Sequence, residues 1–247
     1  MRFFELCKYS AEQALKGVLL KAIFAVIVLL LIALSLVPRL PLPEVVISIS
    51  LVMGYAYFIT ATAGNIIEKT DRHMIELFLS KPVTRRDIIL ADFAGTVTAV
   101  SLSLMVLSVG LWVLYGLRLS VWDVKFLSLS ASMILGFGAM YSFMILMGVA
   151  IRNSSVIILV WVGYAYIGAL VLENRSEVIY TKMPSTIYKV IIDGVYYILP
   201  PIYSIQKVFS RLSFDNIQNF LPIIIPIIST ACALTCAIII LGRKEPE

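Results

Sequence analysis

Charged side chains gather in one interlude of this chain, residues 68–92, which reads EKTDRHMIELFLSKPVTRRDIILAD. The interlude lies between two long apolar runs, in a chain that is 60% hydrophobic and only 14% charged. Charged side chains on a short exposed segment tune the rate of association with a protein partner and the choice of that partner. The interlude is therefore a candidate contact site for a water-soluble partner.

The rest of the chain has few residues that could carry out catalysis. His73 is the single histidine, so neither a serine–histidine pair nor a histidine metal centre can form at membrane depth. The stretch from Gly64 to Thr70 is not a phosphate-binding loop, because Ala63 and Glu68 occupy the required glycine positions. We therefore predict a protein that is not an enzyme, with no metal and no cofactor of its own.

Composition predicts the elements that must position the interlude. The mean hydropathy is +0.97, and about 20 consecutive apolar residues are needed to cross a hydrocarbon core of about 30 Å. Six such runs predict an all-α polytopic membrane protein, in one domain over residues 1–247. They are approximately 19–37, 45–66, 93–116, 126–150, 155–172 and 220–241.

Ionisable groups are nearly missing from the interiors of these runs. No acidic residue lies at mid-span, where proton- or sodium-coupled carriers commonly place carboxylates. Glu44 and Asp92 lie at span ends, and we expect both to be solvated flanking groups.

The distribution of lysine and arginine predicts the orientation. Basic residues in short segments beside the spans mark the cytoplasmic side. They are frequent in the N-terminal segment, in the interlude, at Arg152 and at the C-terminus, whereas the short connections on the opposite side hold only Arg39, Arg118 and Lys125. The long segment 173–219 does not count, because long loops cross the membrane largely regardless of their charge. We therefore expect a multi-pass protein of the plasma membrane with both termini in the cytoplasm. This topology explains the net charge of +5 better than nucleic-acid binding does.

Two flanking segments are predicted to be special. Residues 1–18 are expected to form an interfacial helix whose apolar face holds Phe3, Cys7, Ala14 and Leu15. Residues 173–219 are expected outside the cell. Their apolar stretch, residues 187–197, is too short to cross a bilayer and favours a re-entrant or interfacial element.

The interlude itself predicts a helical hairpin over residues 67–92. Ile67, Met74, Ile75 and Phe78 fall on one helical face, and this first helix must end before Pro82. Thr84 and Asp87 form the pattern of a capping box, so a second helix is predicted to start at Arg85 and to continue into the third span. These residues alone fit a partner site and a basic elbow held by anionic lipid equally well.

Part of the hairpin also resembles a known family. Glu68, the stretch IELFLSKPVTRRDI at 75–88 and Phe93-Ala94-Gly95 are similar to the cytoplasmic segment between the second and third spans of ABC-2-type ABC transporter permeases. The family pattern is roughly a glutamate, a Gly-Thr pair and then ELLLSxPVSRREIL. The chain departs from it at His73-Met74, which stand in place of Gly-Thr.

The resemblance implies a permease subunit of an ATP-driven transporter, more specifically an exporter. It would pair with a second copy of itself or a paralogous permease, within membrane lipid, and two separate ATPase subunits would bind the ATP. The hairpin would act as the coupling helix that docks on the ATPase. The implied contact residues are Glu68, Arg72, Glu76, Lys81, Pro82, Arg85 and Arg86.

Two other classes of protein stay open on the sequence. One is a membrane scaffold or assembly factor that transports nothing, and the other is a secondary carrier or channel. The sequence does not specify a substrate.

Overall fold

The computed structural model describes residues 2–16, 25, 28–29, 31–33, 36, 84–120, 122, 125–151, 153–164, 171–172, 174–180, 186–199 and 221–243. Every regular element in these ranges is a helix, which confirms the predicted all-α class for this part of the chain. The helices are α1 (Arg2–Lys16), α5 (Arg85–Leu119), α6 (Lys125–Ile151), α7 (Ser154–Gly163), α9 (Arg175–Val178), α10 (Thr186–Ile198) and α12 (Leu221–Arg243).

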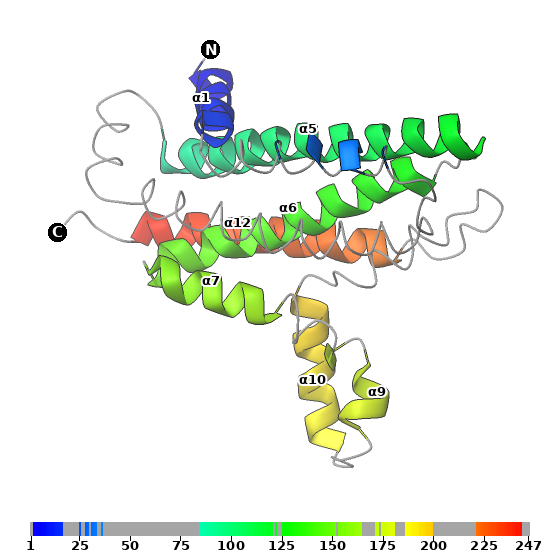
Figure 1. The fold of residues 1–247 in the computed structure, drawn as a ribbon. Helices are drawn as coiled ribbons and strands as arrows, with labels where there is room; N and C mark the ends of the chain where they lie inside the picture. The colour runs from blue at the N-terminus through cyan, green and yellow to red at the C-terminus, as the bar shows by residue number, and fades with distance from the viewer. Residues whose placement is uncertain are drawn as a thin grey trace.

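Three helices are long and apolar enough to cross a membrane. Their candidate spans are Arg86–Arg118, Met133–Ile151 and Ile224–Arg243, and they correspond to the predicted runs 93–116, 126–150 and 220–241. Helices of this kind indicate a membrane protein. The colours in Figure 1 show that α5 runs in the direction opposite to α6 and α12.

The other three predicted spans lie wholly or partly outside the described residues. Run 45–66 is outside them, and run 19–37 contributes only a few helical residues, of which Leu31 contacts α5 beside Gly110. Run 155–172 begins with α7, but residues 165–170 are not described. The total of six membrane spans therefore stays a prediction.

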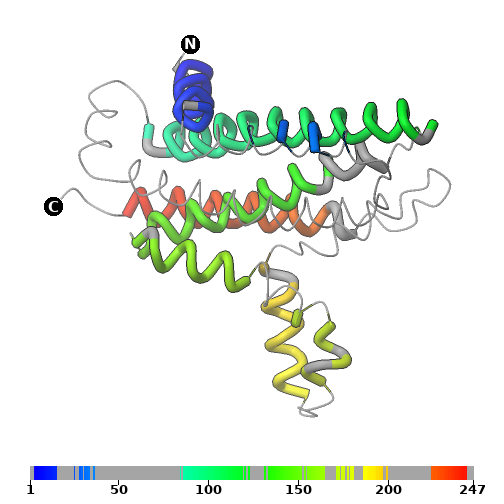
Figure 2. The backbone as a smooth tube through the Cα atoms, viewed as in Figure 1, coloured from blue at the N-terminus to red at the C-terminus, as the bar shows by residue number. Residues whose placement is uncertain are grey.

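Helix α6 forms the centre of the bundle and runs obliquely between α5 and α12 (Figure 2). Its residues Phe137, Met140, Tyr141 and Met144 are almost completely buried, and their spacing places them on one helical face. They pack with buried side chains of the three neighbouring helices, including Leu104, Leu111, Tyr115, Ile157, Trp161, Ala237 and Leu241.

Helix α5 also carries an exposed apolar stripe. Leu102, Met105, Val106, Val109 and Val113 are all well exposed and recur at helical spacing. Such a stripe is costly in water but not in hydrocarbon, where lipid tails cover it. This distribution of side chains agrees with a helix that faces lipid on one side.

Helix α1 lies across the N-terminal half of α5. Figure 1 views α1 nearly along its axis and α5 from the side, so the two helices cross. Ser10 and Ala14 are buried at the contact and Cys7 is half-buried. Helix α1 lies within the segment 1–18 that was predicted to be helical, whereas its location at the membrane interface stays a prediction.

The four residues of the predicted apolar face of α1 lie in two different surroundings. Phe3 and Leu15 are exposed, which fits an apolar face turned toward lipid, whereas Cys7 and Ala14 lie with Ser10 at the contact with α5. A bulky side chain would hold the two backbones apart, whereas small residues let crossing helices approach closely.

Candidate functional site

The candidate site is the region around the start of α5. Among the implied contact residues, Glu68, Arg72, Glu76, Lys81 and Pro82 lie outside the described residues. Arg85 is the first residue of α5, although its side chain is not among those described, and the Arg86 side chain is exposed. The structure therefore describes where the predicted hairpin joins the membrane bundle.

A capping box fixes the start of α5. Thr84 has an extended backbone (φ −84°, ψ 153°), and its Oγ1 accepts a hydrogen bond from the backbone N–H of Asp87 at 3.2 Å. In return, Asp87 Oδ2 accepts from the Thr84 backbone N–H at 3.2 Å and from its hydroxyl at 2.6 Å. This geometry confirms the predicted cap and the predicted helix start at Arg85.

The cap makes a first testable prediction. Thr84→Ala removes the side-chain half of the box and should cost the first turn of α5 about 1 kcal/mol. Faster hydrogen exchange at the amides of Asp87 and Ile88 would show this loss. Thr98→Ala is the matched control, because the Thr98 hydroxyl only donates to Ala94 of its own helix. Equal exchange in both variants would contradict a structural role for the box.

A buried polar cluster joins α5 to α6 a short distance further along. The Tyr141 hydroxyl donates to Asp92 Oδ2 at 2.8 Å and lies 3.2 Å from Thr96 Oγ1. Asp92 is only 8% exposed and Tyr141 is completely buried. The expectation of a solvated Asp92 was therefore wrong, because packing against α6 removes this carboxyl from water and supplies it with a hydrogen-bond donor.

Aromatic stacking holds the tyrosine in place. Its ring stacks on Phe137 at a centroid distance of 5.5 Å and on Phe93 at 6.3 Å. The hydroxyl is therefore directed at Asp92 by a ring that has little freedom to rotate. A signal in the sequence was available, because Asp92, Thr96 and Ser103 are polar residues that share one face of an otherwise apolar helix.

Gly95 lies between Asp92 and Thr96 in the sequence and contacts α1. A Cβ at this position would lie 2.5 Å from the Cys7 carbonyl oxygen, 2.8 Å from Ser10 Cβ and 2.9 Å from the Ala11 nitrogen. No side chain fits there without moving α1. The first turns of α5 are therefore packed against both α1 and α6.

The end of the bundle at which α5 starts can be compared with the predicted topology. In Figure 1, the N-terminal end of α5 and the C-terminal end of α12 lie on the same side. The predicted hairpin thus joins the bundle at the end where the last helix finishes. The predicted topology requires this arrangement.

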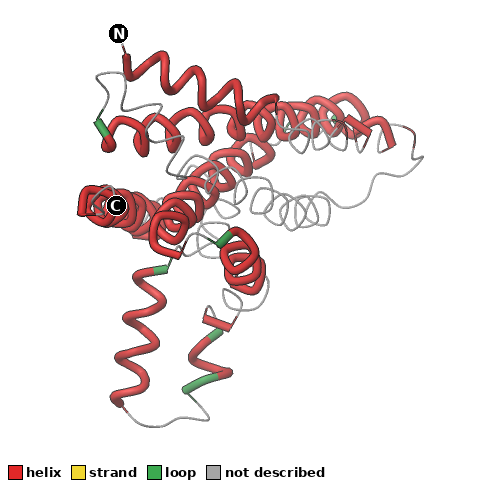
Figure 3. The backbone as a smooth tube through the Cα atoms, turned by 90° about the vertical axis from the view of Figure 1, so that its left-hand side faces the viewer, coloured by secondary structure: helices red, strands yellow, loops and turns green. Residues whose placement is uncertain are grey.

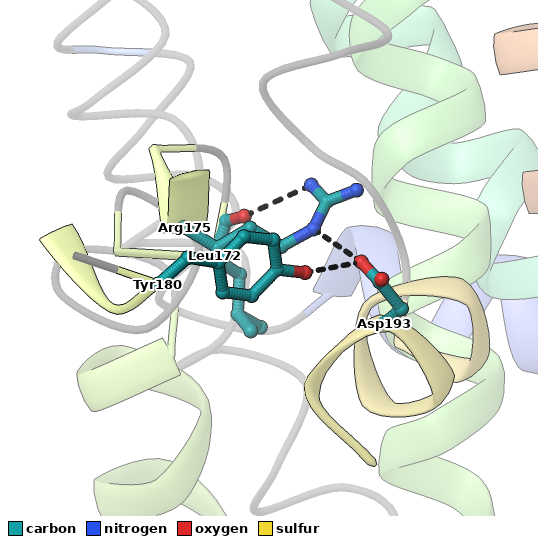
Figure 4. A network of polar contacts seen from close by, with 4 residues as sticks. All are labelled: Leu172, Arg175, Tyr180 and Asp193. Atoms are coloured by element: carbon teal, nitrogen blue, oxygen red, sulfur yellow. Dashed lines mark hydrogen bonds and ion pairs between the residues drawn. The ribbon is translucent and has the colours of Figure 1, made fainter. Parts of the chain in front are cut away.

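A second polar cluster lies in the segment predicted to be external (Figure 4). Asp193 Oδ1 of α10 accepts from Arg175 Nε at 2.7 Å and from the Tyr180 hydroxyl at 2.6 Å. Arg175 also donates to the Leu172 carbonyl at 3.2 Å, and its guanidinium lies 3.8 Å from the centre of the Tyr196 ring. We call Arg175, Tyr180 and Asp193 the clasp.

The clasp should depend on pH. The hydrogen bonds from Tyr180 and then Arg175 hold the pKa of Asp193 below its ordinary value of 3.8. A lowered carboxyl pKa contributes stability above the ordinary pKa, and this contribution is lost as the pH falls through the lowered value. We expect α10 to be held firmly at neutral pH and to loosen only below pH 3.8. The mobility of a spin label on α10 measures this, and Asp193→Asn should abolish the dependence. An acid-induced rise in mobility that is as large in Asp193→Asn as in the unmutated chain would contradict it.

Comparison with models of known protein families gives no match, and comparison with curated protein sequences gives no significant match. The likeness of residues 75–88 to ABC-2-type permeases therefore stays an expectation drawn from a short motif. Within the described part of the chain, no group of three or more His, Cys, Asp or Glu side chains could hold a metal ion.

Proposed function

We propose that this chain is the membrane-spanning permease subunit of an ATP-driven ABC transporter, and specifically of an exporter. A separate ATPase subunit binds and hydrolyses the ATP. The hairpin at residues 67–92 receives the motion of that subunit, through Glu68, Arg72, Glu76, Lys81, Pro82, Arg85 and Arg86. The permease works as a pair, with a second copy or a paralogous chain.

One observation carries the proposal: α5 is a single helix from its capped start to Leu119. The cap lies directly after the Lys81-Pro82-Val83 turn of the predicted hairpin. A push on that turn therefore reaches a continuous membrane helix without passing through a loop. A basic elbow that only rested on lipid would have no need of this rigid connection.

The packing of α5 explains how such a push would spread. Asp92 and Thr96 connect α5 to α6 through hydrogen bonds with Tyr141, and α1 packs against α5 at Gly95. Displacement of the first turns of α5 would therefore move α1 and α6 with it. Since α6 also contacts α7 and α12, the whole described bundle responds to the hairpin.

Purification of the complex from its native membrane tests the proposal. A tagged chain extracted in mild detergent should bring with it a nucleotide-binding subunit with vanadate-sensitive ATPase activity. The double charge reversal Arg85→Glu with Arg86→Glu should lower the recovery of that subunit, by roughly fivefold if the two charges together contribute about 1 kcal/mol.

Arg243→Glu is the matched control. Arg243 is also exposed and lies at the same end of the bundle, on α12 rather than on the hairpin. Its reversal should leave recovery unchanged. A chain that is always purified alone would favour a scaffold or assembly factor over a transporter.

The buried carboxyl of Asp92 supports a second candidate, an ion-coupled carrier. Ionisable residues inside membrane bundles often mark ion pathways, and Asp92 accepts a hydrogen bond from the Tyr141 hydroxyl, which also lies 3.2 Å from Thr96 Oγ1. This candidate predicts transport by the purified chain in liposomes without ATP, driven by an ion gradient and lost in Asp92→Asn. The permease proposal predicts no such transport.

A further inference from the structure

Helix α10 presents an apolar face that no described element covers. The exposed fractions are 70% for Ile187, 54% for Tyr188, 66% for Val190, 55% for Ile191 and 40% for Val195. On a helix of 13 residues these positions fall on one side. In water this side would be a costly surface, so some apolar medium or partner must cover it.

The opposite side of α10 holds its polar side chains, and these already have hydrogen-bond or cation–π partners. Asp193 is hydrogen-bonded to Arg175 and Tyr180 (Figure 4). The Arg175 guanidinium also lies 3.8 Å from the centre of the Tyr196 ring. Lys189 lies 5.5 Å from the centre of the Tyr180 ring. Helix α10 therefore turns its charged side chains toward α9 and its aliphatic side chains away from it, the reverse of the pattern in a water-soluble helical hairpin.

The direction of α10 decides how this side could meet a bilayer. Figure 1 shows α12 from the side, and Figure 3, turned by 90°, shows it nearly along its axis. Helix α10 runs vertically in both views, so it lies crosswise to α12. If α12 spans the membrane, α10 is oriented along the membrane plane.

We propose that the apolar side of α10 is a lipid-binding surface that lies flat in the interfacial layer of the bilayer, and that the clasp holds it in this orientation. An amphipathic helix in the membrane plane buries its apolar side to about 5–10 Å, at the boundary between headgroups and acyl chains. The exposed Tyr188 suits this boundary, where tyrosine is enriched. The proposal resolves the choice between a re-entrant and an interfacial segment in favour of the interfacial one.

Lipid fits this surface better than a second copy of the chain. Stable protein interfaces bury about 800 Å² on each partner. A helix of 13 residues is only about 20 Å long, and five side chains on one side of it present too little area for that. The exposed apolar stripe of α5 is a second surface of this chain that lipid would cover.

Spin-label accessibility in lipid nanodiscs tests the proposal on the full chain. Cys7, Cys232 and Cys236 are free, so they are first changed to alanine to give a cysteine-free background. Single labels are then placed by Ile187→Cys and Ile191→Cys on the apolar side. Glu177→Cys, on the exposed part of α9, provides the matched control.

We expect labels at Ile187 and Ile191 to be reached by oxygen, which concentrates in lipid, and shielded from a water-soluble nickel chelate. The label at Glu177 should show the opposite preference. Strong nickel accessibility at Ile191 would place this surface in water and overturn the proposal. Exclusion of both reagents together with dipolar coupling between labels on two chains would also overturn it, in favour of a second copy.

The role of the clasp has its own readout. In the Ile191→Cys background, Asp193→Asn weakens the clasp and should reduce the ratio of oxygen to nickel accessibility at the label. Glu177→Gln also neutralises one carboxylate, in α9 and outside the clasp, and should leave the ratio unchanged. An unchanged ratio in Asp193→Asn would show that the clasp does not orient α10. None of these measurements requires an ATPase partner, so they are independent of the permease proposal.

Discussion

Replacement of Gly95 by alanine should detach α1 from α5. The new Cβ would meet the Cys7 carbonyl oxygen at 2.5 Å and the Ala11 nitrogen at 2.9 Å. These are backbone atoms that cannot rotate away, so the whole of α1 must shift. Overpacking of this kind typically costs 1–3 kcal/mol, and Gly95→Leu should cost more.

Two measurements on the purified chain check this prediction. Thermal unfolding in detergent reports the loss of stability, and the distance between spin labels on α1 and α5 reports the separation of the helices. Gly163→Ala is the control, because a Cβ at that position of α7 meets nothing within 4 Å. An unshifted label distance in Gly95→Ala would mean that α1 does not rest on this glycine.

Tyr141→Phe should cause the second large loss of stability. The phenyl ring keeps its stacking on Phe137 and Phe93, but the buried carboxyl of Asp92 loses the donor that approaches to 2.8 Å. A buried polar group deprived of a partner costs about 1–3 kcal/mol. We expect a loss of stability in this range and weaker attachment of α6 to α5.

A double-mutant cycle separates the hydrogen bond from other effects of the substitution. Asp92→Leu combined with Tyr141→Phe should cost less than the sum of the two single changes, because each single change already removes the hydrogen bond between the two side chains and the double variant loses it only once. Ser103→Ala is the control on the same face of α5, since the Ser103 hydroxyl only reaches Ala99 of its own helix, at 3.5 Å. Simple additivity in the cycle would refute the proposed link between α5 and α6.

The sequence specified the features that depend on neighbouring residues. Thr84 and Asp87 are three positions apart, so their box and the start of α5 could be predicted from local preferences. The presence of a helix in residues 1–18 followed in the same way from its amphipathic pattern. The apolar runs 93–116, 126–150 and 220–241 predicted the three helices that can cross a membrane because length and hydropathy alone decide that property.

Features that depend on the pairing of distant helices could not be predicted in this way. Asp92 and Tyr141 are 49 positions apart, and nothing in the residues around Asp92 says which helix faces it. The contact of Gly95 with α1 is of the same kind, since a glycine in an apolar helix fits many neighbours. The crosswise direction of α10 is also a property of the packed chain, whereas its short apolar stretch fitted both a re-entrant and an interfacial segment.

The position of Gly95 along α5 has a mechanical consequence. Gly95 is ten positions after Arg85 and twenty-four positions before Leu119, which gives arms of about 15 Å and 36 Å at the rise of an α-helix. If the crossing with α1 acts as a fulcrum, a rigid α5 is a lever with unequal arms. A tilt that moves its capped end by 1 Å would then swing its far end by roughly 2.4 Å in the opposite sense.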